Sequence, residues 1–196
     1  MSEPLGLQVA LLTGQSDSRG WALSPLQARF LSAVVPPECT RVEINFPYWS
    51  RSPAYRATSL VSASISNGWM YFRSRSPAFR ETRRASVAEL IGRRAKTIFL
   101  AGSCGLELFN NLQLPTELMR KVGIFAYGPV ARRRPSCDHL LVGSSRDRLS
   151  RHYFPAPDRV VECGHLDYLA EPAVQAFCKG FIERVVNAAA REEASA

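Results

Sequence analysis

Three side chains that together could carry out nucleophilic catalysis each follow a stretch that we expect to be a strand. Ser103 follows an apolar strand-like run, Asp147 follows a second one, and His165 follows a third. The carboxyl ends of parallel strands lie at one edge of a sheet, so these side chains would meet there. A serine hydroxyl becomes a useful nucleophile when a base takes its proton and an acid orients that base. The three residue types therefore indicate acyl-transfer chemistry at this edge.

The acid and the base each have a plain structural alternative. Asp147 lies between two arginines and could form a surface ion pair, and His165 could be a loop histidine with an ordinary hydrogen bond. His139 begins its strand, which puts it at the opposite end of the sheet, whereas His152 stays open as an alternative base. Other acids near these strands are Asp138, Asp158 and Asp167.

The residues around Ser103 predict a sharp turn between a strand and a helix. The pattern is Ala101-x-Ser103-x-Gly105, with apolar residues at helical spacing after it. A turn that lifts a serine above a sheet edge is strained and leaves room only for small residues two positions away on either side. Cys104 could also be the nucleophile, but Leu106 would then crowd the turn. The pattern therefore favours Ser103.

This strand–turn–helix segment resembles the nucleophile elbow of the α/β-hydrolase superfamily, with Ala101 in place of the first glycine of the usual motif. Gly143 and Asp147 resemble the exit from the strand that carries the acid in that family. Gly164-His165 resembles its glycine–histidine turn. The resemblance implies that Ser103 is the nucleophile, Asp147 the orienting acid and His165 the base. The three follow one another along the chain in the same order as in the family.

The resemblance also implies the remaining parts of the site. The backbone N–H of Cys104, together with that of Gln15 or Ser16 after the first strand, would hold the oxyanion. Aromatic residues in loops at the same edge could line an apolar acyl pocket, and we name three of them as candidates. These are Tyr48, Trp49 and Tyr127. Neither a cofactor nor a metal ion is expected.

Strand patterns alternate with helix patterns, which is typical of an α/β fold. The expected strands cover residues 7–12, 42–46, 96–101, 121–127, 139–143 and 159–163, and the expected helices cover 25–35, 86–94, the segment after 105 and the segment from 172. An irregular helix should precede Pro77 and be interrupted by it, and Ser86 should cap the helix 86–94. No clear helix is expected between Asp147 and His165.

These elements predict an α/β-hydrolase-like fold with about six mostly parallel strands flanked by helices, in a single domain over residues 1–196. About ten residues join Gly128 to Asp138, at the place where many members of the superfamily carry a cap domain. We therefore expect no cap domain.

Composition gives an expectation about compartment. The 196 residues are 46% hydrophobic, and none of the apolar runs approaches the roughly 20 residues needed to cross a bilayer. The first residues lack the basic and apolar parts of a secretory signal. The five cysteines are odd in number and lack CxxC spacing, so disulfides and a structural zinc site are not expected. These features predict a cytoplasmic protein without a membrane partner.

The formal net charge is +8, and arginine supplies most of it. Basic residues are concentrated between 73 and 94 and at 132–134. Codon usage in a GC-rich genome would explain the preference for arginine, whereas an anionic partner such as CoA or an acidic carrier protein would explain the clusters. A nucleic-acid motif does not accompany them, so we do not expect nucleic acid as a partner.

The leading hypothesis is a serine hydrolase or acyltransferase that acts on an ester or thioester through an acyl-enzyme, with thioesterase as the preferred subclass. A non-catalytic binding or scaffold protein on the same fold is one alternative. A nucleic-acid-binding module that uses the arginine clusters is another.

Overall fold

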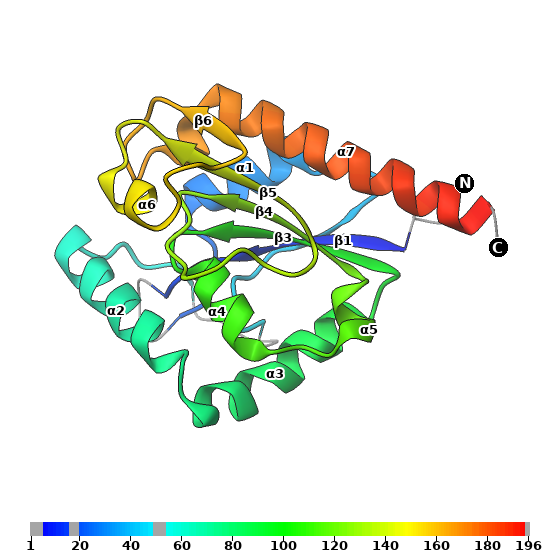
Figure 1. Cartoon of the computed structure of the whole chain (residues 1–196), viewed down its shortest axis with the longest axis horizontal. Helices are drawn as coiled ribbons and strands as arrows, with labels where there is room; N and C mark the ends of the chain where they lie inside the picture. Colours follow the sequence, from blue (N-terminus) through cyan, green and yellow to red (C-terminus); the bar gives the residue numbers. More distant parts are fainter. Residues whose placement is uncertain (1–5, 16–19, 49–53, 195–196) are drawn as a thin grey trace.

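A six-stranded sheet forms the centre of the computed structural model, which describes residues 6–15, 20–48 and 54–194 (Figure 1). Its strands, in spatial order, are β2 (Thr40–Val42), β1 (Leu7–Leu12), β3 (Lys96–Gly102), β4 (Val122–Tyr127), β5 (Asp138–Ser144) and β6 (Arg159–Val161). All five neighbouring pairs are parallel. The predicted fold class, an α/β fold with six mostly parallel strands, is confirmed.

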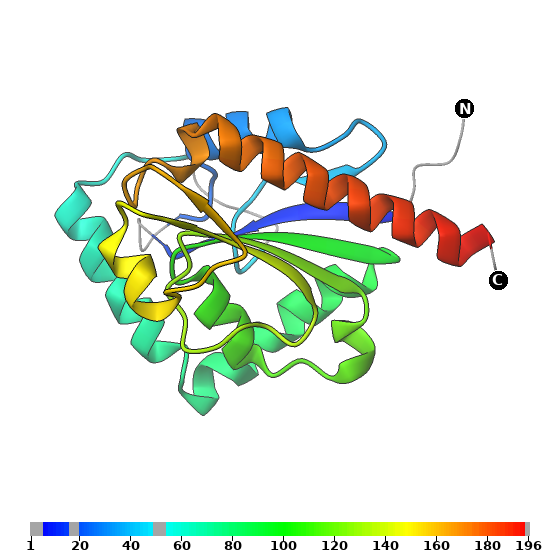
Figure 2. The ribbon, with the colours of Figure 1, turned by 45° about the horizontal axis from the view of Figure 1, so that its top comes forward.

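Helices cover both faces of this sheet, as a parallel sheet requires because each connection must cross over a face. Figure 2 shows α1 (Pro25–Val34) and α7 (Pro172–Ala194) on one face. The other face carries α2 (Leu60–Arg73), α3 (Pro77–Gly92), α4 (Gly105–Leu112) and α5 (Thr116–Met119). The helix α6 (Arg148–Tyr153) and the 3₁₀ helix η1 (Tyr168–Ala170) follow the carboxyl ends of β5 and β6.

The side chains of β3 show how the sheet divides the core. Ile98 and Leu100 pack with the apolar residues of α1 and α7, whereas Phe99 and Ala101 pack with those of α3 and α4. All four are fully buried. A strand with both faces buried reads as a continuous apolar run, which is why this element could be recognised in the sequence.

The second strand differs from its predicted range. We expected residues 42–46, but β2 ends at Val42. Ile44 then forms a single antiparallel bridge with Ala22, and the Asn45 side chain accepts a hydrogen bond from the Thr13 amide at 3.0 Å. The chain leaves the sheet here because this buried amide holds the turn that follows β1.

The helix around Pro77 also differs from the prediction. Pro77 does not interrupt a helix but begins α3, and the Ser76 hydroxyl accepts a hydrogen bond from the Phe79 amide at 3.2 Å. Proline suits the first position of a helix because its missing N–H would have no partner there. Ser86 therefore lies inside α3 and does not cap it.

Two further features concern the edge that carries the site. Residues 128–137 connect β4 and β5 without a helix or strand, in agreement with the predicted absence of a cap domain at this point. The helix α6 was not predicted, and it fills part of the link between Asp147 and His165.

Within the described ranges, every helix is too short or too polar to cross a membrane.

Candidate active site

Ser103 occupies a strained turn between β3 and α4. Its φ angle is 50°, a left-handed value that is uncommon for residues other than glycine. The Ser103 amide donates to the Tyr127 carbonyl at 3.2 Å, and its carbonyl accepts from the Val130 amide at 2.9 Å, so both sides of the turn are attached to the end of β4. A side chain at Gly105 would overlap the Leu12 carbonyl oxygen. The small flank that the elbow pattern requires therefore has a steric cause.

The structure brings Ser103, His165 and Asp147 into one continuous contact. Ser103 Oγ lies 3.1 Å from His165 Nε2, and His165 Nδ1 lies 2.7 Å from Asp147 Oδ2. The Asp147 side chain is 1% exposed, whereas that of His165 is 25% exposed. The Asp147 carboxylate is therefore shielded from solvent, whereas the His165 imidazole is partly exposed and accessible to a substrate.

Asp147 uses its two carboxylate oxygens for different purposes. Oδ1 accepts the Leu149 and Ser150 amides, both at 3.1 Å, and so caps the N-terminus of α6. Oδ2 accepts hydrogen bonds from His165 and from the Tyr168 hydroxyl, the latter at 3.0 Å. The arginines beside Asp147 do not draw it to the surface, because the capped helix holds the carboxylate inward.

The alternative bases and acids lie elsewhere. His139 Nδ1 is 2.8 Å from the Cys137 carbonyl, at the start of β5, and His152 is exposed beside Tyr153. Asp138 pairs with Arg184 and Asp158 pairs with Arg134, and Asp167 is exposed. Within the described part of the chain, neither of these histidines is hydrogen-bonded to Ser103, in contrast to His165.

Two polar residues that the sequence analysis did not single out support this arrangement. Ser144 Oγ donates to the Cys163 carbonyl at 2.6 Å and accepts from the Cys163 amide at 2.9 Å, which joins the ends of β5 and β6. Burial and the neighbouring Asp147 carboxylate raise the pKa of Tyr168 well above its usual value, so its hydroxyl remains a donor at any ordinary pH. Neither residue belongs to a recognisable sequence motif.

The amides of Cys104 and Gln15 lie at the ends of β3 and β1, where an oxyanion would be held. In the described part of the chain, neither amide donates to a backbone carbonyl. A side chain at Gly14 would lie 2.7 Å from Cys104 Sγ and would overlap the side-chain amide of Asn67, so a larger residue here would have to displace both side chains. The Gln15 carbonyl accepts from Ser66 Oγ at 2.5 Å. Ser16, the alternative donor, lies outside the described residues.

Cys104 is unsuited to be the nucleophile. Its side chain is buried, and burial raises its pKa to about 12 despite hydrogen bonds from the Gly14 amide and its own amide. A thiol with this pKa carries almost no thiolate near neutral pH, and the thiolate is the reactive form. The need for a small side chain next to Ser103 in the turn is sufficient to explain a cysteine at position 104.

A cavity of about 540 Å³ lies beside Ser103 and His165. Its walls come mainly from α2, α6 and the loop after β6, and they include apolar and aromatic side chains. Among these side chains are Tyr55, Tyr71, Phe72, Leu149, Tyr153 and Leu166. Carboxylate side chains do not contribute to this lining among the described residues. The cavity therefore suits an uncharged apolar group attached to the reacting carbonyl.

The three aromatic residues named from the sequence have different positions. Tyr127 lines the cavity, and its ring packs against Gly102. Tyr48 does not line it: its hydroxyl donates to the Leu11 carbonyl at 2.7 Å and its ring packs on Phe99. Trp49 lies outside the described residues. The substrate-binding candidate Tyr48 is therefore a packing residue, because its polar end is already used by the first strand.

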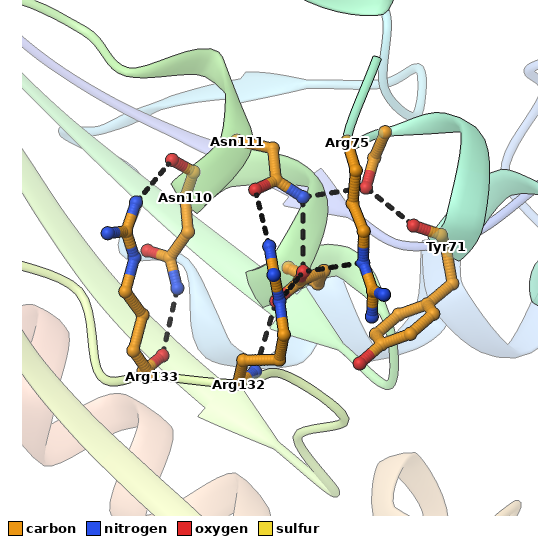
Figure 3. Close-up of polar contacts among 8 residues, drawn as sticks. Tyr71, Arg75, Asn110, Asn111, Arg132 and Arg133 are labelled. Carbon is orange, nitrogen blue, oxygen red and sulfur yellow. Dashed lines mark hydrogen bonds and ion pairs between the residues drawn. The ribbon is translucent and has the colours of Figure 1, made fainter.

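Glu107, in the first turn of α4, holds the elements that flank the elbow. Its side chain is 1% exposed and pairs with the Arg132 side chain at 2.7 Å and with Arg75 at 3.5 Å. Asn111 donates to Glu107 at 3.1 Å and to Ser74 at 2.8 Å. Figure 3 shows these contacts joining α4 to the end of α2 and to the loop after β4. The helix behind Ser103 is thereby fixed to one wall of the cavity.

The charge state of Glu107 follows from the same contacts. Burial alone would raise the pKa of its carboxyl, but hydrogen bonds from the Arg132 amide, the Arg132 side chain and Asn111 lower the pKa below its usual value overall. The group is therefore a carboxylate at neutral pH.

Among the described residues, clusters of three His, Cys, Asp or Glu side chains suited to a metal ion do not occur.

Comparisons with known proteins bear on the fold. The sequence matches neither a family model nor a curated protein. A solved structure from Xanthomonas campestris, described as an α/β serine hydrolase without a lid, has a TM-score of 0.51 at 12% identity, covering 92% of this chain and 82% of that chain. An uncharacterized protein from Bacillus cereus has a TM-score of 0.52 at 11% identity, covering 94% of this chain and 60% of that chain. The chain therefore has the α/β-hydrolase fold, in an arrangement that resembles a hydrolase without a lid.

Proposed function

We propose that this protein is a serine hydrolase or acyltransferase that acts on an ester or thioester with an apolar acyl group. The observation that carries the proposal is the contact from Ser103 through His165 to Asp147, with distances of 3.1 Å and 2.7 Å, at the wall of an apolar cavity. A base within hydrogen-bond reach of a serine, itself held by a buried acid, is the geometry that makes the hydroxyl nucleophilic.

The residues would act in the following order. Ser103 Oγ attacks the acyl carbon while His165 Nε2 takes its proton, and Asp147 Oδ2 holds the imidazole with Nδ1 protonated. The amides of Cys104 and Gln15 stabilise the negative charge on the carbonyl oxygen. His165 then protonates the leaving alcohol or thiol, which departs and leaves an ester on Ser103. Water or another acceptor, deprotonated by His165, releases the acyl group and restores the serine.

The cavity supports an apolar acyl group, because its lining is rich in aromatic and aliphatic side chains and lacks carboxylates among the described residues. Either an oxygen or a sulfur leaving group suits these steps. We keep thioesterase as the preferred subclass because the basic surface would attract an anionic leaving group such as CoA or the surface of an acidic carrier protein.

The experiment is steady-state hydrolysis of p-nitrophenyl esters and acyl-CoA thioesters of increasing chain length. The wild type should turn over at least one series, with preference for acyl groups longer than acetyl. Ser103→Ala and His165→Ala should each lower kcat by several powers of ten, roughly as in other enzymes of this kind. The matched control is Cys104→Ala, which alters the neighbouring small side chain. Equal turnover by wild type and Ser103→Ala, or the absence of turnover with both series, would favour the non-catalytic alternative.

A further inference from the structure

Most of the large apolar side chains that the structure leaves exposed lie on the elements around the cavity. Tyr55, Phe72, Leu149 and Leu166 are at least 45% exposed and also line the cavity. Ile65 and Trp69 are 68% and 66% exposed on α2, and Val160 on β6 is the remaining large apolar residue in this class among the described residues. Such a concentration marks a surface that is covered by something else.

The apolar residues of α2 form one stripe. Ile65, Trp69 and Phe72 are spaced by four and three residues, so they lie on the same side of the helix. The other side of α2 is held by Tyr71, which is buried, and by Ser66, which donates to the Gln15 carbonyl. Figures 1 and 2 both show α2 at the outer edge of the molecule. The stripe therefore faces outward, while the opposite side of α2 packs against the rest of the protein.

The stripe continues the wall of the cavity. Phe72 belongs to both, because it is 63% exposed and also lines the cavity beside Tyr71. The Tyr71 ring lies 6.1 Å from the Tyr153 ring of α6, so α2 and α6 face each other across this region. A partner seated on the stripe would consequently touch the mouth of the cavity.

The charges on this face are almost all positive. Residues 54–80 contain four arginines and neither Asp nor Glu. Arg56, Arg73 and Arg148 of α6 are exposed. None of these three arginines forms an ion pair with a residue in the described part of the chain. The carboxylate of Asp147 is buried. Glu162 and Asp167 are the exposed acids in the loop after β6, and Glu162 lies 3.9 Å from Arg146. An anionic partner would therefore meet little repulsion here.

We propose that this face, defined by α2, α6 and Leu166, docks on an anionic lipid surface. A helix with aromatic and aliphatic residues on one side and arginine near it is suited to lie in the headgroup region of a bilayer. Ile65 and Trp69 project from α2 outside the cavity lining and stand exposed, which fits a soft lipid surface better than a rigid protein. We expected no membrane partner because no apolar run could span a bilayer, but docking at its surface needs no spanning segment.

The inference rests on the proposed function for its consequence. In the docked orientation the mouth of the cavity faces the lipid, so an apolar ester or thioester dissolved in that surface reaches Ser103 without crossing water. Substrates presented in anionic vesicles should accordingly be hydrolysed faster than the same substrates in neutral vesicles.

Flotation with lipid vesicles tests the docking independently of catalysis. The full-length protein is mixed with vesicles of phosphatidylcholine and phosphatidylglycerol (7:3) or of phosphatidylcholine alone. We expect the wild type and Ser103→Ala to float equally well with the anionic vesicles and at least tenfold less with the neutral ones. The double variant Ile65→Ser/Trp69→Ser should lose at least tenfold in vesicle affinity, with Val160→Ser as the matched control. Arg56→Glu/Arg73→Glu should lose a similar amount, with Arg29→Glu on α1 as its control.

A soluble short-chain ester separates this inference from the proposed function. The double variant Ile65→Ser/Trp69→Ser should hydrolyse it within threefold of the wild type, because neither side chain lines the cavity. Equal flotation with neutral and anionic vesicles, or unchanged flotation of the double variant, would overturn the docking and leave the hydrolase proposal intact. A dimer that forms without lipid and is abolished by the same double variant would assign the stripe to a second copy of this chain.

Discussion

Replacement of Asp147 by Asn should separate catalysis from folding, because its two carboxylate oxygens do different work. In Asp147→Asn the amide oxygen can still accept the Leu149 and Ser150 amides, and asparagine caps helices as well as aspartate does. The amide nitrogen would face His165 Nδ1 and donate to it. The imidazole would then carry its proton on Nε2, the atom that lies 3.1 Å from Ser103, where it could not accept the serine proton.

The size of the effect follows from this change of tautomer. We expect kcat/KM to fall on the order of a thousandfold or more, which is about 4 kcal/mol of transition-state stabilisation. The free energy of unfolding should change by less than about 1 kcal/mol, because the helix cap remains and the Tyr168 hydroxyl can accept from the new amide group.

Asp147→Ala is the contrasting variant. It removes the cap of α6, which costs about 1 kcal/mol, and leaves the Tyr168 hydroxyl buried without its acceptor, which costs about 1–3 kcal/mol. The sum is about 2–4 kcal/mol of lost stability, together with a rate loss at least as large as in Asp147→Asn.

The assay is ester hydrolysis in parallel with urea unfolding of both variants. Near-normal turnover in Asp147→Asn would remove Asp147 from the mechanism. Wild-type stability in Asp147→Ala would show that the carboxylate does not cap α6, and either result would refute the reasoning.

Three further outcomes are expected. Cys104→Ala should keep kcat/KM within about fivefold of the wild type, since a thiol with a pKa of about 12 is not the nucleophile; a thousandfold loss of ester hydrolysis would contradict this. Tyr168→Phe should lose about 5–30-fold in kcat/KM through the missing hydrogen bond to Asp147, and unchanged kinetics would show that this bond is not used. Glu107→Gln should be less stable by about 1–3 kcal/mol near pH 7. Because folding lowers the pKa of Glu107, the stability difference between wild type and Glu107→Gln is present above the unfolded pKa of about 4.3 and should shrink as pH falls below it. Urea unfolding at pH 7 and pH 3 measures the change, and a constant difference would contradict the prediction.

Apolar patterning carries most of the fold information in this chain. The strands β1, β3 and β4 are buried on both faces, so their sequences are continuous apolar runs that stand out from the polar segments between them. β2 was misplaced because the segment 42–46 alternates apolar and polar residues, as a half-buried strand does. Hydrogen bonds of the Asn45 side chain with Thr13, in the turn after β1, take the chain out of the sheet instead. Such a contact between distant segments leaves no local pattern.

Residue types and their order predicted which side chains would meet, but not what holds them. The carboxyl ends of parallel strands share an edge, so Ser103, Asp147 and His165 could be expected at the same edge because each follows a predicted strand. Tyr168 and Ser144 are single polar residues whose importance comes from atoms that they touch across the sheet. The helix α6 was missed because it is short and its main signal is its cap, Asp147, which the sequence analysis had assigned to catalysis.

The helices α2 and α3 were predicted only in part: an irregular helix was expected before Pro77, and only the second half of α3 was expected to be helical. Their segment is rich in Ser and Arg and weakly apolar, so helical periodicity is hard to see in it. The serines at 59 and 76 cap the two helices, and this capping is visible only once the helix starts are known.

The most direct test of the central claim is the reaction of the protein with a fluorophosphonate probe, followed by intact-mass measurement and fragment mapping of the modified peptide. The account predicts one added phosphonate on Ser103, no labelling of Ser103→Ala, and normal labelling of Cys104→Ala. Modification of Cys104, or equal labelling of wild type and Ser103→Ala, would contradict the assignment of Ser103 as the nucleophile.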